Sequence, residues 1–126
     1  MYKQHELGVD GENIAVQYFQ KNKYRIIEKN FRCKQGEIDI IVYDETTEEI
    51  VFVEVKTRTG SKYGEPRDSV SKIKQKHIKS VASYYNYMYG LYDIPSRYDV
   101  IEILINNKKG VIAGVPLGRS YEEKAI

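Results

Sequence analysis

The sequence predicts an α/β protein in which helices flank a mixed β-sheet, and three observations support this class. Two apolar runs, Ile38–Tyr43 and Ile50–Val55, are separated by a short acidic and threonine-rich break, which is typical of a β-hairpin. Apolar residues recur at helical spacing before this hairpin and again after it. An apolar strand follows the second helix, so that helix can form the crossover that a parallel strand pair requires.

Length and composition indicate one globular domain. The chain has 126 residues, of which 41% are hydrophobic and 30% charged, which allows a sizeable core and argues against disorder. The N-terminus has no signal-peptide pattern and no apolar run is long enough to span a bilayer, so we expect a cytoplasmic protein with no membrane partner. The net charge is only +2, so any surface that binds a polyanion must be local.

The segment before the hairpin predicts one helix, one strand and a turn. Leu7–Asn22 reads as a helix, Tyr24–Arg32 as a strand, and Cys33–Gly36 as the turn into the hairpin. Glu12 falls inside the apolar arc of the helix. Its carboxylate either meets a partner in the interior or lies solvated near the helix start, where the helix dipole favours a negative charge.

The register of the hairpin decides which polar residues meet. If the turn lies at Thr46–Thr47, Asp39 stands opposite Glu54, and Glu37 stands opposite Lys56. Side chains alternate along a strand, so Glu54 and Lys56 share one face.

Two carboxylates placed in this way repel each other by roughly 3 kcal/mol at an effective dielectric constant of about 20. A divalent cation between Asp39 and Glu54 would offset the repulsion, and hard oxygen ligands suit Mg²⁺ or Mn²⁺. Lys56 could orient a water or stabilise charge that develops on a phosphate. This combination is typical of metal-dependent phosphodiester hydrolysis.

A loop and a second helix follow the hairpin. Thr57–Pro66 contains two glycines and a proline and is expected to be a loop. Ser69–Tyr89 reads as a helix that is capped by Asp68 or Ser69. Its predicted buried stripe consists of Val70, Ile73, Ile78, Val81, Tyr85 and Met88.

The lysines of this second helix fall into two groups. Lys72, Lys76 and Lys79 lie on the face opposite the stripe, where they form either a solvated surface or a DNA contact. Lys74 falls within the stripe, where an unpaired ammonium is costly. It either extends to solvent or reaches the acidic residues.

The C-terminal part predicts two more strands. Arg97–Asn106 reads as a strand, Val111–Val115 as a short edge strand that ends at Pro116, and Arg119–Ile126 as a frayed tail. Asp99 is either a distant neighbour of the acidic residues or the ion-pair partner of Arg97, which shares its face.

Asp39 followed by Glu54-Val55-Lys56 resembles the signature of the PD-(D/E)xK nuclease superfamily, with Ile38 in place of the proline. GEIDII, FVEVKTR and RYDV, together with Gly11-Glu12 upstream, are similar to the bacterial YraN-like family, whose described relatives are the archaeal-type Holliday-junction resolvases. The resemblance covers Gly8 to Glu102. It implies a single nuclease-like domain with a restriction-endonuclease-like fold.

This resemblance also implies an activity and assigns roles. It implies a Mg²⁺- or Mn²⁺-dependent endonuclease that acts on DNA, with branched or recombination intermediates as substrates and a homodimer as a possible assembly. Asp39 and Glu54 would hold the metal with the carbonyl of Val55. The other implied site residues are Lys56 for the attacking water, Glu12 as a further acid, Lys74 as support, and Arg32, Arg58 and Lys62 for DNA contact.

Two other interpretations remain open. The chain could be a nucleic-acid-binding or assembly module that has the nuclease scaffold but does not cleave, or Asp39, Glu54 and Lys56 could form a structural ion network. Glu37 either pairs with Lys56 or assists a second metal.

Overall fold

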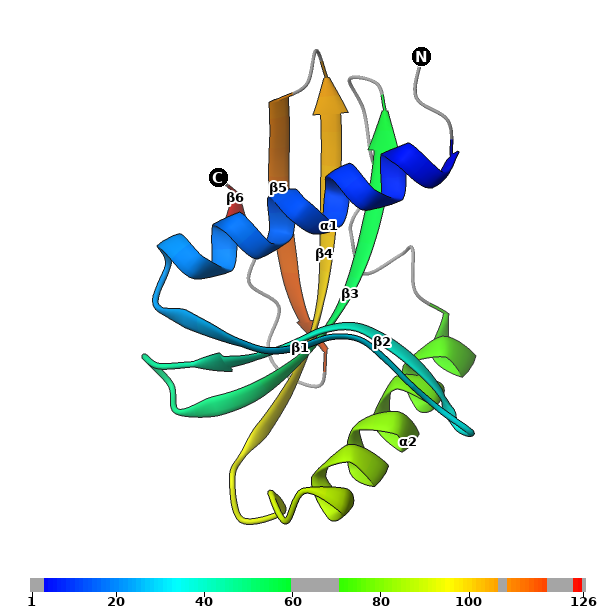
Figure 1. The fold of residues 1–126 in the computed structure, drawn as a ribbon, viewed down its shortest axis with the longest axis vertical. Coiled ribbons are helices and arrows are strands. Elements are labelled where there is room, and N and C mark those ends of the chain that lie inside the picture. Colours follow the sequence, from blue (N-terminus) through cyan, green and yellow to red (C-terminus); the bar gives the residue numbers. More distant parts are fainter. Residues whose placement is uncertain (1–3, 60–70, 107–108, 118–123, 126) are drawn as a thin grey trace.

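A six-stranded sheet with one helix on each face forms the described part of the chain, which comprises residues 4–59, 71–106, 109–117 and 124–125 of a computed structural model (Figure 1). The strands lie in sequence order, β3 and β4 are parallel, and the other neighbouring pairs are antiparallel. The predicted α/β class is confirmed, and the architecture is consistent with a restriction-endonuclease-like fold. The elements are α1 (Gln4–Lys21), β1 (Tyr24–Cys33), β2 (Gly36–Asp44), β3 (Glu49–Thr59), α2 (Lys72–Met88), β4 (Ser96–Asn106), β5 (Lys109–Leu117) and β6 (Lys124–Ala125).

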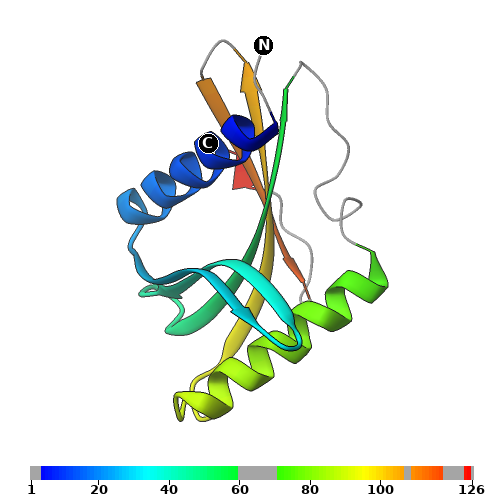
Figure 2. The ribbon, with the colours of Figure 1, turned by 45° about the vertical axis from the view of Figure 1, so that its right-hand side comes forward.

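The alternation of side chains in β3 assigns one face of the sheet to each helix (Figure 2). Val51 and Val53 belong to a buried cluster that includes Phe19 of α1. Ile50 and Phe52 belong to a second cluster, which is formed with α2. Helix α2 connects the parallel strands β3 and β4, so it is the crossover that the sequence predicted.

Strand β3 is longer than predicted. Its pairing with β4 continues to Thr59 opposite Ile105, so the beginning of the predicted loop Thr57–Pro66 is strand. Parallel pairing supplies backbone partners there, and this pairing cannot be read from the local composition. The remainder of that predicted loop lies outside the described residues.

The C-terminal strands also extend beyond their prediction. Strand β5 runs from Lys109 through Pro116 to Leu117, and it has a second neighbour because Ala113 pairs with Ala125 of β6. It is therefore not an edge strand. Lys124 and Ala125, which were expected to be frayed, are paired in β6, and residues 118–123 and 126 lie outside the described residues.

Helix α2 begins later than predicted. Its N-cap is Ser71, whose Oγ accepts a hydrogen bond of 3.1 Å from the backbone N–H of Lys74, in place of the predicted Asp68 or Ser69. Ile73 is 68% exposed and Met88 is also exposed, because both lie outside the arc that faces the sheet. Val70 lies outside the described residues. The buried residues of α2 are Ile78, Val81, Ala82 and Tyr85. Neither α1 nor α2, the two described helices, is long and apolar enough to cross a bilayer.

Gly11 allows the first half of α1 to lie directly on β3. A Cβ atom at this position would collide with the side chain of Thr57. The contact fixes the helical turn that carries Glu12.

We predict that Gly11→Ala destabilises the fold by about 1–3 kcal/mol, because the added methyl group overpacks the contact with Thr57. At an exposed helix position, replacement of glycine by alanine normally stabilises a protein by about 1 kcal/mol. A loss of stability in Gly11→Ala would therefore indicate the close contact with Thr57. Urea unfolding would measure it. Asn13→Ala, at an exposed position of the same helix, is the control and should be neutral or stabilising; an equal gain in both variants would contradict the close packing.

Candidate active site

The ladder between β2 and β3 ends beside Asp39 and Glu54. Its pairs run from Asp44–Glu49 to Ile40–Val53, which confirms the predicted register and turn. Asp39 Oδ2 accepts a hydrogen bond of 2.8 Å from the backbone N–H of Val55. The Asp39 carboxylate thus takes the place of the next backbone partner and is held next to Glu54.

Glu54 is buried and Asp39 is partly buried beside it. Glu54 is only 7% exposed, and burial together with the negative charge of Asp39 raises the pKa of Glu54 to about 7. Burial also raises the pKa of Asp39, although the hydrogen bond from Val55 acts in the opposite direction. The two carboxyl groups lie within hydrogen-bonding reach of each other. Near neutral pH the pair therefore tends to retain one proton.

Two lysines lie on the same side of Glu54. The Nζ atoms of Lys56 and Lys74 are 3.6 Å and 3.7 Å, respectively, from Glu54 Oε1. Lys74 lies one helical turn before Ile78, so its stem follows the buried face of α2 and its ammonium reaches the acid. Of the two possibilities for Lys74, the structure shows the contact with the acidic residues. Both lysines lower the pKa of Glu54, but burial and Asp39 raise it by more.

Glu12 approaches the acid pair from the other helix. Its side chain is partly buried, and burial followed by the negative charge of Asp39 raises the pKa of Glu12. An interaction with Asp39 requires that Glu12 faces the sheet. A hydrogen bond with Asn30 and the positive charge of Lys29 act in the opposite direction, so Glu12 lies at the border between the acid pair and the surface.

The donor set at this site fits a hard divalent cation. Two desolvated carboxylates carry the repulsion that such an ion would offset, and their oxygen atoms are the ligands that Mg²⁺ and Mn²⁺ prefer. Within the described residues, no three acidic, histidine or cysteine side chains are grouped closely enough to hold a metal by themselves. The carbonyl of Val55, water and a substrate phosphate would have to complete the coordination, as is usual for Mg²⁺.

Glu37 has a different partner from the one predicted. It forms an ion pair of 3.2 Å with Arg32, because the β1–β2 ladder continues to these two residues, whereas the β2–β3 ladder ends before Glu37 can meet Lys56. The Arg32 side chain is 77% exposed and so remains open to a ligand. Arg58 lies in β3 opposite Leu104, but its side chain is not described, and Lys62 lies outside the described residues.

Sequence reasoning missed Glu102, which is almost fully buried in β4. It lies beside Lys56 in the parallel register and on the same face of the sheet. The available signal was an acidic residue inside the apolar run from Val100 to Ile105. Such a residue places a buried carboxyl group next to Lys56.

A second polar region lies at the turn end of the hairpin. Buried Arg97 forms ion pairs of 3.0–3.1 Å with Asp44, Glu49 and Asp99, which confirms the predicted Arg97–Asp99 pair. Burial acts against ionisation of Asp44, but hydrogen bonds from Arg97, Thr46 and Thr47 outweigh it and lower the pKa of this carboxyl.

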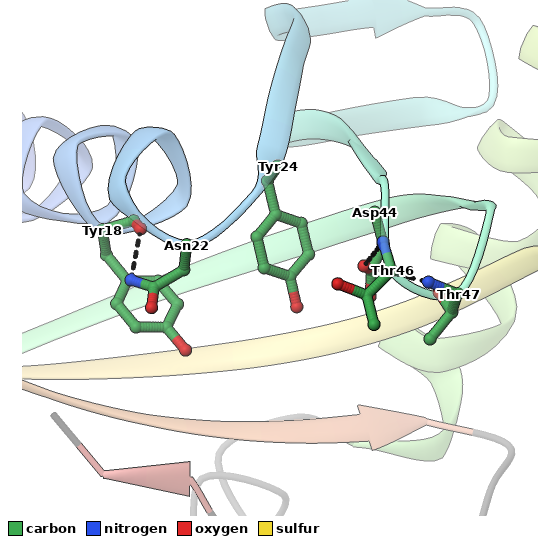
Figure 3. Close-up of a pocket in the computed structure, with 6 residues that line it drawn as sticks. All are labelled: Tyr18, Asn22, Tyr24, Asp44, Thr46 and Thr47. Carbon is green, nitrogen blue, oxygen red and sulfur yellow. Dashed lines mark hydrogen bonds between the residues drawn. The ribbon is translucent and has the colours of Figure 1, made fainter.

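A polar pocket of about 210 Å³ lies beside this cluster (Figure 3). Asp44 lines it, but both carboxylate oxygens already accept hydrogen bonds, one from the backbone of the turn and the other from Arg97. The carboxylate of Asp44 in this pocket therefore stabilises the turn of the hairpin. Its other lining residues are Tyr18, Asn22, Tyr24, Thr46 and Thr47.

The fold and the site define a class of α/β protein in which a mixed sheet and the helix α2 bring two acids and two lysines together. Residues 11–103 match the family described as Uncharacterised protein family UPF0102, and the chain belongs to this family.

Similar proteins span most of the chain. UPF0102 proteins of Caldicellulosiruptor saccharolyticus and Geobacter metallireducens are 44% and 43% identical over 107 and 110 residues, which cover 85% and 87% of this chain and 89% and 88% of the relatives. A UPF0102 protein of Clostridioides difficile is 48% identical over 104 residues, or 82% of this chain and 90% of the relative. The family match includes every site residue from Glu12 to Glu102.

We predict that Glu54→Gln stabilises the metal-free protein at pH 8. The raised pKa means that the native state holds a proton which the unfolded state releases between about pH 4.5 and 7, so stability falls as the pH rises through this interval. Glutamine removes this cost, which is at most about 3 kcal/mol. Urea unfolding in a chelator should show the gain at pH 8 and a smaller difference near pH 4.5. Glu45→Gln, at an exposed position, should have no such effect; a less stable Glu54→Gln protein at pH 8 would refute the desolvated pair.

Proposed function

We propose that this protein is a metal-dependent endonuclease that hydrolyses DNA phosphodiester bonds, with branched DNA or recombination intermediates as the substrate class. The supporting observation is the pair of Asp39 and Glu54, with Lys56 and Lys74 both in contact with Glu54. Two desolvated acids side by side carry an electrostatic cost that the hydrogen bond from Val55 and the two lysines do not remove, because the pKa of Glu54 stays raised. Such an arrangement is expected where the acids serve chemistry.

In the proposed reaction, each of these residues has a distinct task. Asp39, Glu54 and the carbonyl of Val55 would hold Mg²⁺ or Mn²⁺, which would supply Lewis-acid chemistry at the phosphate. The ammonium of Lys56 orients the attacking water and stabilises the negative charge that develops on the phosphate. Lys74 contributes a second positive charge at the same carboxylate, and Glu12 adds an acidic contact beside Asp39.

Contacts to the DNA backbone would come from three basic residues. Arg32, Arg58 and Lys62 are the proposed phosphate ligands, and they would position the substrate without reading its sequence. Symmetric cleavage of a junction requires two sites, so the proposal includes a homodimer.

We predict that the protein cleaves labelled single-stranded, duplex, flap or four-way-junction DNA with Mg²⁺ or Mn²⁺, and that Asp39→Asn and Glu54→Gln abolish cleavage because each removes a metal ligand. Lys56→Met should lower kcat by about 10²–10³-fold, the loss typical of one electrostatic group that acts in the transition state. Glu45→Gln, an acid-to-amide change far from the pair, is the matched control and should cleave like the parent. Comparison of the four substrates ranks the preference for branched DNA.

Two results would overturn this proposal. Undiminished cleavage by Glu54→Gln would show that the activity comes from another site or a contaminant. Salt-sensitive DNA binding without cleavage under any divalent ion would favour the non-catalytic binding module. A thermal shift adds an independent readout, because Mn²⁺ should raise the Tm of the parent and not of Glu54→Gln if the acids bind metal, whereas a purely structural ion network predicts no shift.

A further inference from the structure

The surface of α2 that faces away from the sheet has an ordered composition. Lys72, Lys76, Lys79, Ser83 and Tyr87 follow at spacings of four, three, four and four residues, so they lie on one face of the helix. This outer face of α2 is opposite the arc that packs against the sheet. From Lys72 to Tyr87 it is about 22 Å long at 1.5 Å per residue.

The lysines of this outer face are not explained by helix stability. Helix α2 contains no acidic residue, and Lys72 and Lys76 lie near its N-terminus, where the helix dipole disfavours positive charge. Lys72 and Lys76, and likewise Lys76 and Lys79, are close enough to repel each other. None of the three forms an ion pair within the described part of the chain, whereas Lys74 on the inner face is paired with Glu54. The outer face thus presents three positive charges that a polyanion would neutralise.

Exposed tyrosines continue the surface where the lysines end. Residues 83–92 contain no charged side chain, and Tyr87 and Tyr92 are 75% and 69% exposed. The turn after α2 folds back on the helix, since the N–H of Leu91 donates to the carbonyl of Asn86 at 2.8 Å. This bond keeps Tyr92 near the last turn of the helix. Tyr84 also has an exposed ring, and the three form what we call the tyrosine patch: Tyr84, Tyr87 and Tyr92.

Charged and aromatic groups in this order fit one kind of ligand. Single-stranded nucleic acid offers phosphates to lysines and unstacked base faces to aromatic rings, whereas a duplex hides its base faces. A second copy of the chain fits less well, because a two-fold contact uses the same face of both copies and α2 has no acidic residue that could pair with the lysines. The combination therefore favours an unpaired strand over a dimer contact.

We propose that the outer face of α2 and the tyrosine patch bind single-stranded DNA. The choice of DNA rests on the proposed function, in which the same helix contributes Lys74 to the catalytic acids. The unpaired arm of a branched substrate would then lie along α2 while its phosphodiester bond lies at Asp39 and Glu54.

Binding can be tested without cleavage by fluorescence anisotropy of a labelled oligothymidine in a chelator. Tyr87→Ala/Tyr92→Ala should weaken binding about tenfold or more, because each lost stack contributes to affinity, while Tyr87→Phe/Tyr92→Phe should bind like the parent. The same alanine variant should leave the weaker binding of a duplex unchanged. All four substitutions are at exposed positions, and urea unfolding would verify that the fold is retained.

The lysine contribution has its own readout, the salt dependence. Lys76→Gln/Lys79→Gln should reduce the slope of log K against log salt concentration by about 1.4, since each phosphate contact to a single strand contributes about 0.7. Lys21→Gln/Lys23→Gln removes the same charge from exposed positions at the end of α1 and should leave the slope unchanged.

The inference would be overturned if the tyrosine-to-alanine variant bound oligothymidine as tightly as the parent, or if Lys21→Gln/Lys23→Gln reduced the salt slope as much as Lys76→Gln/Lys79→Gln. Tighter, tyrosine-dependent binding of oligouridine would overturn it as well, because RNA would then be the ligand. Sedimentation that shows a dimer which the alanine variant dissociates, with DNA affinity unaltered, would assign the surface to a second copy. The nuclease proposal is tested separately. Binding of oligothymidine by a parent protein that does not cleave under any divalent ion would leave the α2 surface intact and refute only the nuclease.

Discussion

Two acidic side chains lie together where β2 separates from β3, and the elements around them limit the resulting electrostatic cost. The backbone N–H of Val55 is hydrogen-bonded to Asp39, and Lys56 and Lys74 approach Glu54 from β3 and from α2. These contacts reduce the cost without removing it, because the pKa of Glu54 remains near 7. A purely structural pair would be replaced by apolar residues at little expense in stability. The metal ion proposed for the acid pair would offset the cost that remains.

Helices on both faces of the sheet contribute side chains to the acid pair. Helix α2 supplies Lys74 from the face that carries Glu54, while α1 supplies Glu12 from the other side. Glu12 can interact with Asp39 because Gly11 lets α1 settle on Thr57. The site thus depends on how closely both helices pack on one short stretch of sheet.

Sequence patterns predicted the parts of the site that local geometry determines. The hairpin register followed from the turn and from side-chain alternation, and the inward position of Lys74 followed from the helical spacing of Ile78 and Val81. Features set by pairing between distant strands were missed or wrong. The continuation of β3 to Thr59 depends on β4, and the choice of Arg32 as the partner of Glu37 depends on where one ladder ends and another continues. The predicted N-cap, Asp68 or Ser69, was wrong because several neighbouring polar residues can cap a helix, and the structure uses Ser71.

The early end of the β2–β3 ladder has one further consequence. Among the described strands, only β4 pairs with β3 beyond Val53, so the next residues of β3 have one backbone edge without a β2 partner. An edge of this kind is a template on which the extended segment of another chain can add as a new strand. Natural proteins guard such edges with charged side chains, and Lys56 lies on this part of β3. Charges near the acid pair would then also protect the protein from self-association, so neutral replacements here are best assessed for solubility as well as for chemistry.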